Sequence, residues 1–104
     1  MIKDITQDEW VEMIENDKDA VILDVRTDDE VAEGYIPGMI NYDIHGGQEF
    51  MDQLNTLDKS KNYYVYCRSG ARSGQACQIM DQNGFANAYN LIGGFMNWDG
   101  DIEE

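Results

Sequence analysis

The sequence contains few cations, a single histidine and no long apolar run. Its 104 residues include 7 Lys and Arg against 21 Asp and Glu, which gives a formal net charge of −14. Nucleic acids and anionic membranes attract cationic proteins, so this charge argues against both as partners. No apolar run approaches the roughly 20 residues that a membrane-spanning helix needs. His45 lies in a glycine-rich stretch without a Cys or His pattern around it, so we predict no metal site.

Cysteine is also scarce, with two in the whole sequence. The residues after Met1 do not form the apolar stretch of a secretory signal peptide. Both observations indicate a reducing, intracellular setting, and we expect a cytoplasmic location. The hydrophobic fraction of 42% is ordinary for a folded protein. We therefore expect a single domain over residues 1–104, with one core that needs no disulfide.

One stretch, residues 62–77, combines three local patterns. Asn62–Tyr66 is aromatic and β-branched, which predicts a strand. The next residues are small or basic and predict a tight loop, and a helical apolar pattern follows from near Ser73. Cys67 therefore lies where a strand ends and a loop leads to a helix N-terminus. Backbone N–H groups at such a place favour an anion, so we predict an easily ionised, nucleophilic thiol.

The distribution of charge supports an anionic ligand near this cysteine. All 21 acidic residues lie outside residues 59–80, a window that contains Lys59, Lys61, Arg68 and Arg72. We expect the two arginines to point at the centre of the loop, where a guanidinium makes forked contacts with an oxyanion.

Strands alternate with helices along the rest of the chain. This alternation predicts a parallel α/β sheet, whose ligands bind beyond the carboxyl ends of the strands. Cys67 falls at such an end. We expect strands at residues 3–5, 20–23, 39–42, 62–66 and 88–91, and helices at residues 7–16, 28–32, 48–54 and 73–83. Capping boxes at Thr6 and Thr27 start the first two helices.

Four further residues and the C-terminal tail receive structural interpretations. Cys77 falls on the apolar side of its helix, which favours core packing over a redox role. Asp24 and Arg26 follow a buried strand and are interpreted as a structural pair, and Trp98 as a cover for the edge of the core. The acidic residues 99–104 are expected to fray.

Five segments together resemble a single-domain rhodanese, a sulfurtransferase. They are Leu23–Arg26, Gly34–Asn41, Tyr66–Ser73, Gly84–Phe85 and Leu91–Trp98. The resemblance implies a rhodanese-like α/β fold, in which helices flank both faces of a central five-stranded parallel sheet. Tyr35 departs from the family, whose members often have His there, and Tyr66 stands where some related proteins have His.

The resemblance also implies a chemistry. Cys67 is the predicted catalytic nucleophile, which would accept a sulfane sulfur as a persulfide. The donor would be thiosulfate or another small anionic sulfur compound, and the acceptor a thiol, cyanide or a protein. No metal or organic cofactor is required. The predicted substrate-binding residues are Arg68, Ser69, Gly70, Ala71, Arg72 and Ser73.

Two alternatives remain open from the sequence. Cysteine phosphatases and arsenate reductases use a similar strand, loop and helix, but their loop has the spacing C-x5-R. Here Cys67 and Arg72 have the spacing C-x4-R, which suits one extra sulfur better than a phosphate group. The chain could instead be a persulfide carrier or regulatory module that docks a protein partner.

Overall fold

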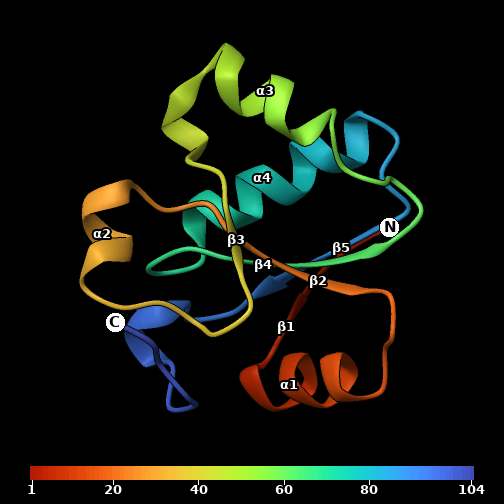
Figure 1. Ribbon diagram of the computed structural model, residues 1–104. Coiled ribbons are helices and arrows are strands. Elements are labelled where there is room, and N and C mark those ends of the chain that lie inside the picture. The colour runs from red at the N-terminus through yellow and green to blue at the C-terminus, as the bar shows by residue number, and fades with distance from the viewer.

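Five parallel strands form the centre of the molecule (Figure 1). The computed structural model describes residues 1–104. The strands are β1 (Ile2–Ile5), β2 (Ala20–Asp24), β3 (Ile40–Asn41), β4 (Asn62–Tyr66) and β5 (Asn87–Leu91). Their order across the sheet is β1-β5-β4-β2-β3, and every pair is parallel. The helices are α1 (Gln7–Glu15), α2 (Asp28–Ala32), α3 (Gln48–Leu54) and α4 (Ala71–Gln82), with 3-10 turns η1 (Ile44–Gly46) and η2 (Phe95–Asn97).

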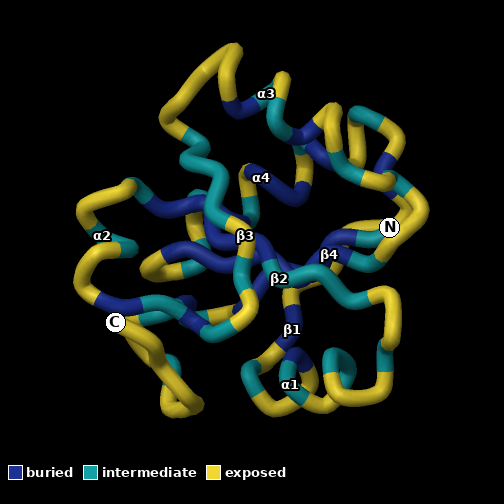
Figure 2. The backbone as a smooth tube through the Cα atoms, in the orientation of Figure 1, coloured by how far each residue is buried: buried dark blue, intermediate teal, exposed yellow.

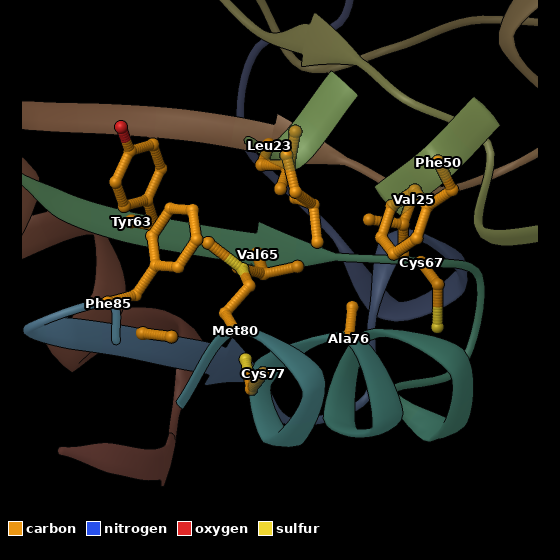
Figure 3. Packing of buried hydrophobic residues seen from close by; sticks show 12 residues of the cluster. Leu23, Val25, Phe50, Tyr63, Val65, Cys67, Ala76, Cys77, Met80 and Phe85 are labelled. Atoms are coloured by element: carbon orange, nitrogen blue, oxygen red, sulfur yellow. The ribbon is translucent and has the colours of Figure 1, made fainter. Parts of the chain in front are cut away.

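Helices cover both faces of this sheet, which confirms the predicted fold class. Helices α3 and α4 lie on one face and α1 lies on the other (Figure 1). The buried residues accordingly fall into two clusters, one on each side of the central strands. Figure 2 shows that the most buried stretches of the backbone lie at the centre of the molecule. Side chains of a strand alternate between faces, so Tyr63 and Val65 of β4 join one cluster while Tyr64 and Tyr66 join the other. Figure 3 shows the first cluster packed between the strands and α4.

Two element boundaries differ from the prediction. Helix α4 begins at Ala71, two residues before the predicted start near Ser73, because Gly70 adopts the left-handed φ of 106° and turns the chain into the helix. Strand β3 has two residues instead of the four predicted, since it lies at the edge of the sheet and pairs only with Leu23 and Asp24 of β2.

Of the two predicted capping boxes, only the one at α2 forms completely. At α2 the box is complete: the Thr27 hydroxyl accepts from the Glu30 N–H, and the Glu30 carboxylate accepts from the Thr27 N–H at 3.1 Å. At α1 only half of the box forms, since Thr6 accepts from the Glu9 N–H but the Glu9 carboxylate does not return to the Thr6 backbone. Helix α2 therefore starts with a firmly held Glu30 side chain.

The C-terminal tail is tied to the fold, so the prediction that it frays is wrong. Tyr35 and Glu103 exchange two backbone hydrogen bonds of 2.9 Å. The indole N–H of Trp98 donates to the Asp101 carbonyl oxygen at 2.9 Å, and the indole ring packs edge-on against Trp10. Trp98 thus covers the edge of the core, as predicted.

Asp24 and Arg26 form the predicted structural pair at the end of β2. Both side chains are buried, and the Arg26 guanidinium donates twice to Asp24 Oδ2, from Nη2 at 2.8 Å and from Nε at 3.1 Å. Arg26 Nη2 also donates to the Gly34 carbonyl oxygen at 2.8 Å, which attaches the segment after α2 to the sheet. No helix of the chain combines the length and the apolar character required to cross a membrane.

Candidate active site

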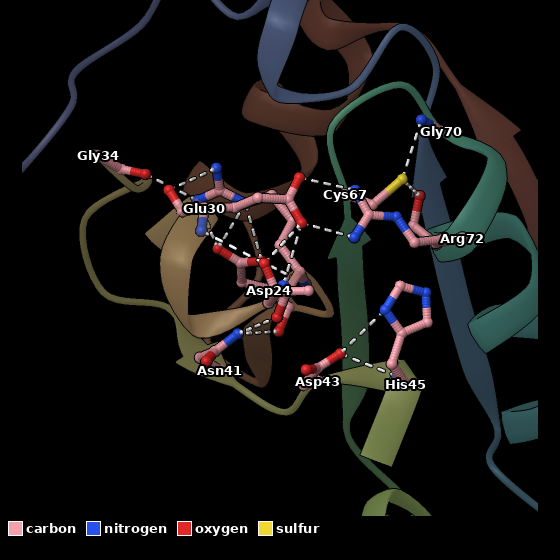
Figure 4. Close-up of polar contacts among 12 residues, drawn as sticks. Asp24, Glu30, Gly34, Asn41, Asp43, His45, Cys67, Gly70 and Arg72 are labelled. Carbon is pink, nitrogen blue, oxygen red and sulfur yellow. Dashed lines mark hydrogen bonds and ion pairs between the residues drawn. The ribbon is translucent and has the colours of Figure 1, made fainter. Parts of the chain in front are cut away.

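Cys67 lies directly after the central strand β4, at the carboxyl edge of the sheet (Figure 4). Only Arg68, Ser69 and Gly70 separate it from the first residue of α4. The residue is fully buried, at 0% relative exposure. The predicted position at the junction of strand, loop and helix N-terminus is therefore the observed one.

The Cys67 sulfur accepts hydrogen bonds from the loop and from the first turn of α4. The Gly70 N–H donates to Sγ at 3.1 Å, and the Ser73 hydroxyl lies 3.3 Å from Sγ. Burial by itself would raise the pKa of the thiol. The hydrogen bonds from the Ser73 hydroxyl and from the N–H groups of Ser73, Gly70 and Ser69 outweigh it, so the pKa of Cys67 is below its ordinary value. These donors lie within the loop and the start of α4, and none of them is one of the flanking arginines.

A buried amide, Asn90 of β5, holds Ser73 in place. The Ser73 hydroxyl lies 2.5 Å from Asn90 Oδ1, while Asn90 Nδ2 donates to Asp4 at 2.9 Å and to the Gly70 carbonyl oxygen at 3.1 Å. Sequence reasoning missed Asn90. A polar residue inside the otherwise buried strand at residues 87–91 was the available signal, since a buried amide needs partners.

A second segment, residues 92–96, packs against the cysteine loop. The Phe95 N–H donates to the Cys67 carbonyl oxygen at 2.8 Å, and the Met96 N–H donates to the Arg68 carbonyl oxygen at 3.0 Å. Gly94 has a φ of 60°, and a Cβ at this residue would lie 2.5 Å from the Arg68 carbonyl oxygen. The close contact between the two loops therefore requires glycine at residue 94.

The two arginines of the loop have different environments. Arg72 forms a two-pronged ion pair with Glu30, with Nη1–Oε1 and Nη2–Oε2 distances of 2.7 and 2.8 Å (Figure 4). Hydrogen bonding to Arg72 lowers the pKa of Glu30 to about 2. Arg68 is exposed, and its side chain makes no hydrogen bond or ion pair. Hydrogen bonding to Glu30, together with the charges of Glu30 and Cys67, raises the pKa of Arg72. The prediction for the two arginines did not include this carboxylate, which holds the guanidinium fork of Arg72.

The remaining predicted substrate-binding residues differ in how far they are buried. Ser69 and Ala71 are exposed, Gly70 is half-buried and Ser73 is fully buried. Lys59 and Lys61 precede β4 whereas Cys67 follows it, so the length of the strand, about 17 Å, separates them from the site. Two of the four cations in the acid-free window are thus remote from the cysteine.

Cys77 is confirmed as a core residue. It is 2% exposed, and burial raises the pKa of its thiol to about 12. The two cysteines therefore differ sharply in their readiness to ionise. Only Cys67 combines a lowered pKa with a ring of hydrogen-bond donors, so it is the candidate nucleophile of the molecule.

Comparison with known proteins gives one consistent family. A family model described as "Rhodanese-like domain" matches residues 6–101. The chain is 42% identical to "Putative sulfurtransferase YtwF" of Bacillus subtilis over 98% of this chain and 95% of the relative. It is 32% identical to a protein named "Sulfurtransferase" of Allochromatium vinosum over 94% of this chain and 89% of the relative. The crystal structure of a rhodanese-like domain protein from Staphylococcus aureus has a TM-score of 0.83 and 36% identity, and the match covers 97% of this chain and 96% of that one.

Proposed function

Because the chain belongs to the rhodanese-like domain family, we propose that it is a sulfurtransferase that moves a sulfane sulfur through a persulfide on Cys67. The single observation that carries this proposal is the environment of the Cys67 sulfur. Its pKa is lowered by donors that converge on it from the loop and from α4. The same donors suit a persulfide anion, which is a terminal sulfur with a negative charge.

The proposed first half-reaction is a displacement at sulfur. The Cys67 thiolate attacks the outer sulfur of thiosulfate, a new S–S bond forms, and the original S–S bond breaks. Sulfite leaves with the electron pair, and Cys67 retains the persulfide anion. Before the attack, the Gly70 N–H and the Ser73 hydroxyl donate to Sγ, which carries the thiolate charge, and exposed Arg68 is available to attract the donor.

The second half-reaction returns the enzyme to the thiolate. An acceptor thiolate or cyanide attacks the outer sulfur of the persulfide, and the Cys67 thiolate is the leaving group. The cycle is therefore ping-pong and needs no redox cofactor, because the sulfane sulfur is transferred without a net change in oxidation state. A thiol of a partner protein can take the place of the small acceptor. The Cys67 persulfide then passes its outer sulfur from one protein to another.

The phosphatase alternative is disfavoured by the loop. Three residues link Cys67 to α4, and two loop N–H groups, those of Ser69 and Gly70, already contact the cysteine sulfur itself. In the first turn of α4, the N–H and the hydroxyl of Ser73 also contact this sulfur, and the buried hydroxyl is bonded to Asn90 as well. This arrangement favours one additional sulfur atom over a tetrahedral phosphate.

Two matched serine variants test the proposal. Cys67→Ser should abolish thiocyanate formation from thiosulfate and cyanide, because the alcohol has no base to activate it. Cys77→Ser should retain most of this activity and lose some stability, because it places a hydroxyl among apolar neighbours. Equal loss of activity in the two variants, with folding confirmed by circular dichroism, would contradict a one-cysteine mechanism.

A further inference from the structure

The carboxylate of Glu30 is firmly held against Arg72. The Glu30 carboxylate accepts from both the N–H and the hydroxyl of Thr27 at 3.1 Å, and from both terminal nitrogens of Arg72. Four donors therefore fix one carboxylate. An incoming anion that displaced it would break the ion pair and one half of the capping box of α2 together.

The surroundings of this pair carry no excess of positive charge. A cavity of about 290 Å³ adjoins the loop, and it is lined by Arg26, Glu30, Glu33, Arg68, Phe95 and Met96. Its two arginines are matched by two glutamates, and Arg26 is additionally paired with Asp24. Arg68 is thus the one cation beside the loop whose side chain has no bonded partner. The site is much less cationic than the acid-free window of the sequence indicated.

The effect of the Glu30–Arg72 ion pair on binding depends on the charge of the sulfur donor. Thiosulfate carries two negative charges, whereas an alkyl thiosulfonate is nearly the same shape and carries one. A carboxylate fixed against Arg72 of the cysteine loop repels the dianion more strongly than the monoanion, and it neutralises the guanidinium that would favour the dianion.

We propose that Glu30 is a specificity-determining residue: by holding Arg72 in an ion pair, it makes the site favour singly charged sulfur donors over the dianion thiosulfate. This inference rests on the proposed sulfur transfer and specifies its substrate class. Donors of the favoured class include alkyl thiosulfonates and low-charge organic persulfides. Glu30 acts through Arg72 and through charge, and it does not itself contact the sulfur.

Glu30→Gln is the decisive variant. Gln at this place in a capping box still accepts from the Thr27 N–H, so α2 keeps its start while the carboxylate charge is lost. The measurement is the ratio of kcat/KM for thiosulfate to kcat/KM for methanethiosulfonate. We expect Glu30→Gln to raise this ratio at least about tenfold, since one fixed charge is removed beside Arg72.

Glu33→Gln is the matched control. Glu33 lines the same cavity and is exposed, with no hydrogen bond or ion pair. Its removal should change the ratio less than about twofold, because an exposed charge is screened by water and salt. Glu30→Ala, which removes the charge and the side-chain half of the capping box, should raise the ratio in the same direction. An unchanged or lower ratio in Glu30→Gln, or an equal rise in Glu33→Gln, would overturn the proposal.

A second readout separates this inference from the proposed function. Sulfate and methanesulfonate differ by the same single charge and contain no sulfane sulfur. Binding of either anion at the site is measured as protection of Cys67 from alkylation by iodoacetamide. Glu30→Gln should improve protection by sulfate relative to methanesulfonate. If neither donor is turned over by any variant but this shift in protection is seen, the sulfurtransferase proposal falls while the role of Glu30 stands. If the shift is absent as well, the role of Glu30 is also refuted.

Discussion

The hydroxyl of Ser73 offers the most quantitative test of how the loop activates Cys67. This hydroxyl has one proton and two acceptors, Sγ of Cys67 at 3.3 Å and Oδ1 of Asn90 at 2.5 Å. When Cys67 is a thiolate, the proton is drawn to the sulfur at the expense of the bond to Asn90. The net stabilisation of the thiolate is therefore at the low end for a hydrogen bond to a charged group, about 1.5 kcal/mol.

Ser73→Ala removes this donor and leaves the Gly70 N–H in place. At a fixed pH near neutrality, 1.5 kcal/mol corresponds to an about tenfold smaller thiolate fraction, so alkylation of Cys67 should slow about tenfold. The midpoint of the pH profile of Cys67 alkylation should move to higher pH in Ser73→Ala. The alkylation rates of the variant and the wild type should become equal in strong alkali. Cys77 does not contribute to the signal, because its raised pKa of about 12 keeps it unreactive in the wild type and in the variant.

The assay is iodoacetamide alkylation from pH 5 to 10, with the modified peptide identified by mass spectrometry. Ser60→Ala is the matched control, since Ser60 is exposed and its hydroxyl bonds only Asp58. Ser60→Ala should leave the pH profile of Cys67 alkylation unchanged. An unmoved midpoint in Ser73→Ala, or a shift toward lower pH, would refute the assignment of Ser73 as the donor that stabilises the thiolate.

Two further predictions concern the supports of the site. Gly94→Ala should destabilise the fold and lower sulfur transfer, because its Cβ would meet the Arg68 carbonyl group. Gly84→Ala is the control. It should lower the free energy of unfolding by only about 1–2 kcal/mol, since Gly84 has a φ of 88° and open space around it. Equal losses of thermal stability would show that the loop contact is unimportant. Asp24→Ala should lower the free energy of unfolding in urea by about 3–5 kcal/mol, because it leaves Arg26 buried without its partner. A loss below about 1 kcal/mol would mean that the pair contributes little.

The sequence predicted well what depends on local patterns. The alternation of strands and helices, the complete capping box at Thr27 and the place of Cys67 after β4 all follow from neighbouring residues, and all are observed. Cys77 was assigned to the core from helical periodicity alone, and the structure agrees.

The prediction failed where distant segments meet. Glu30 is 42 positions from Arg72 in the sequence, so an acid-free window around Cys67 gave no warning that a carboxylate reaches its arginine. Asn90 likewise reaches Ser73 only because β5 pairs with β4. The tail was expected to fray because its composition is acidic, yet the backbone of Glu103 pairs with Tyr35, and composition does not predict such pairing.

The central claim is that Cys67 carries the transferred sulfur, and the mass of the protein after exposure to a donor tests it most directly. The wild-type protein is incubated with methanethiosulfonate or thiosulfate, desalted, and measured intact and after peptide mapping. We predict a gain of one sulfur atom on the peptide that contains Cys67, reversed by cyanide, absent in Cys67→Ser and retained in Cys77→Ser. A wild-type protein that gains no sulfur from either donor, or that gains it on Cys77, would contradict the account.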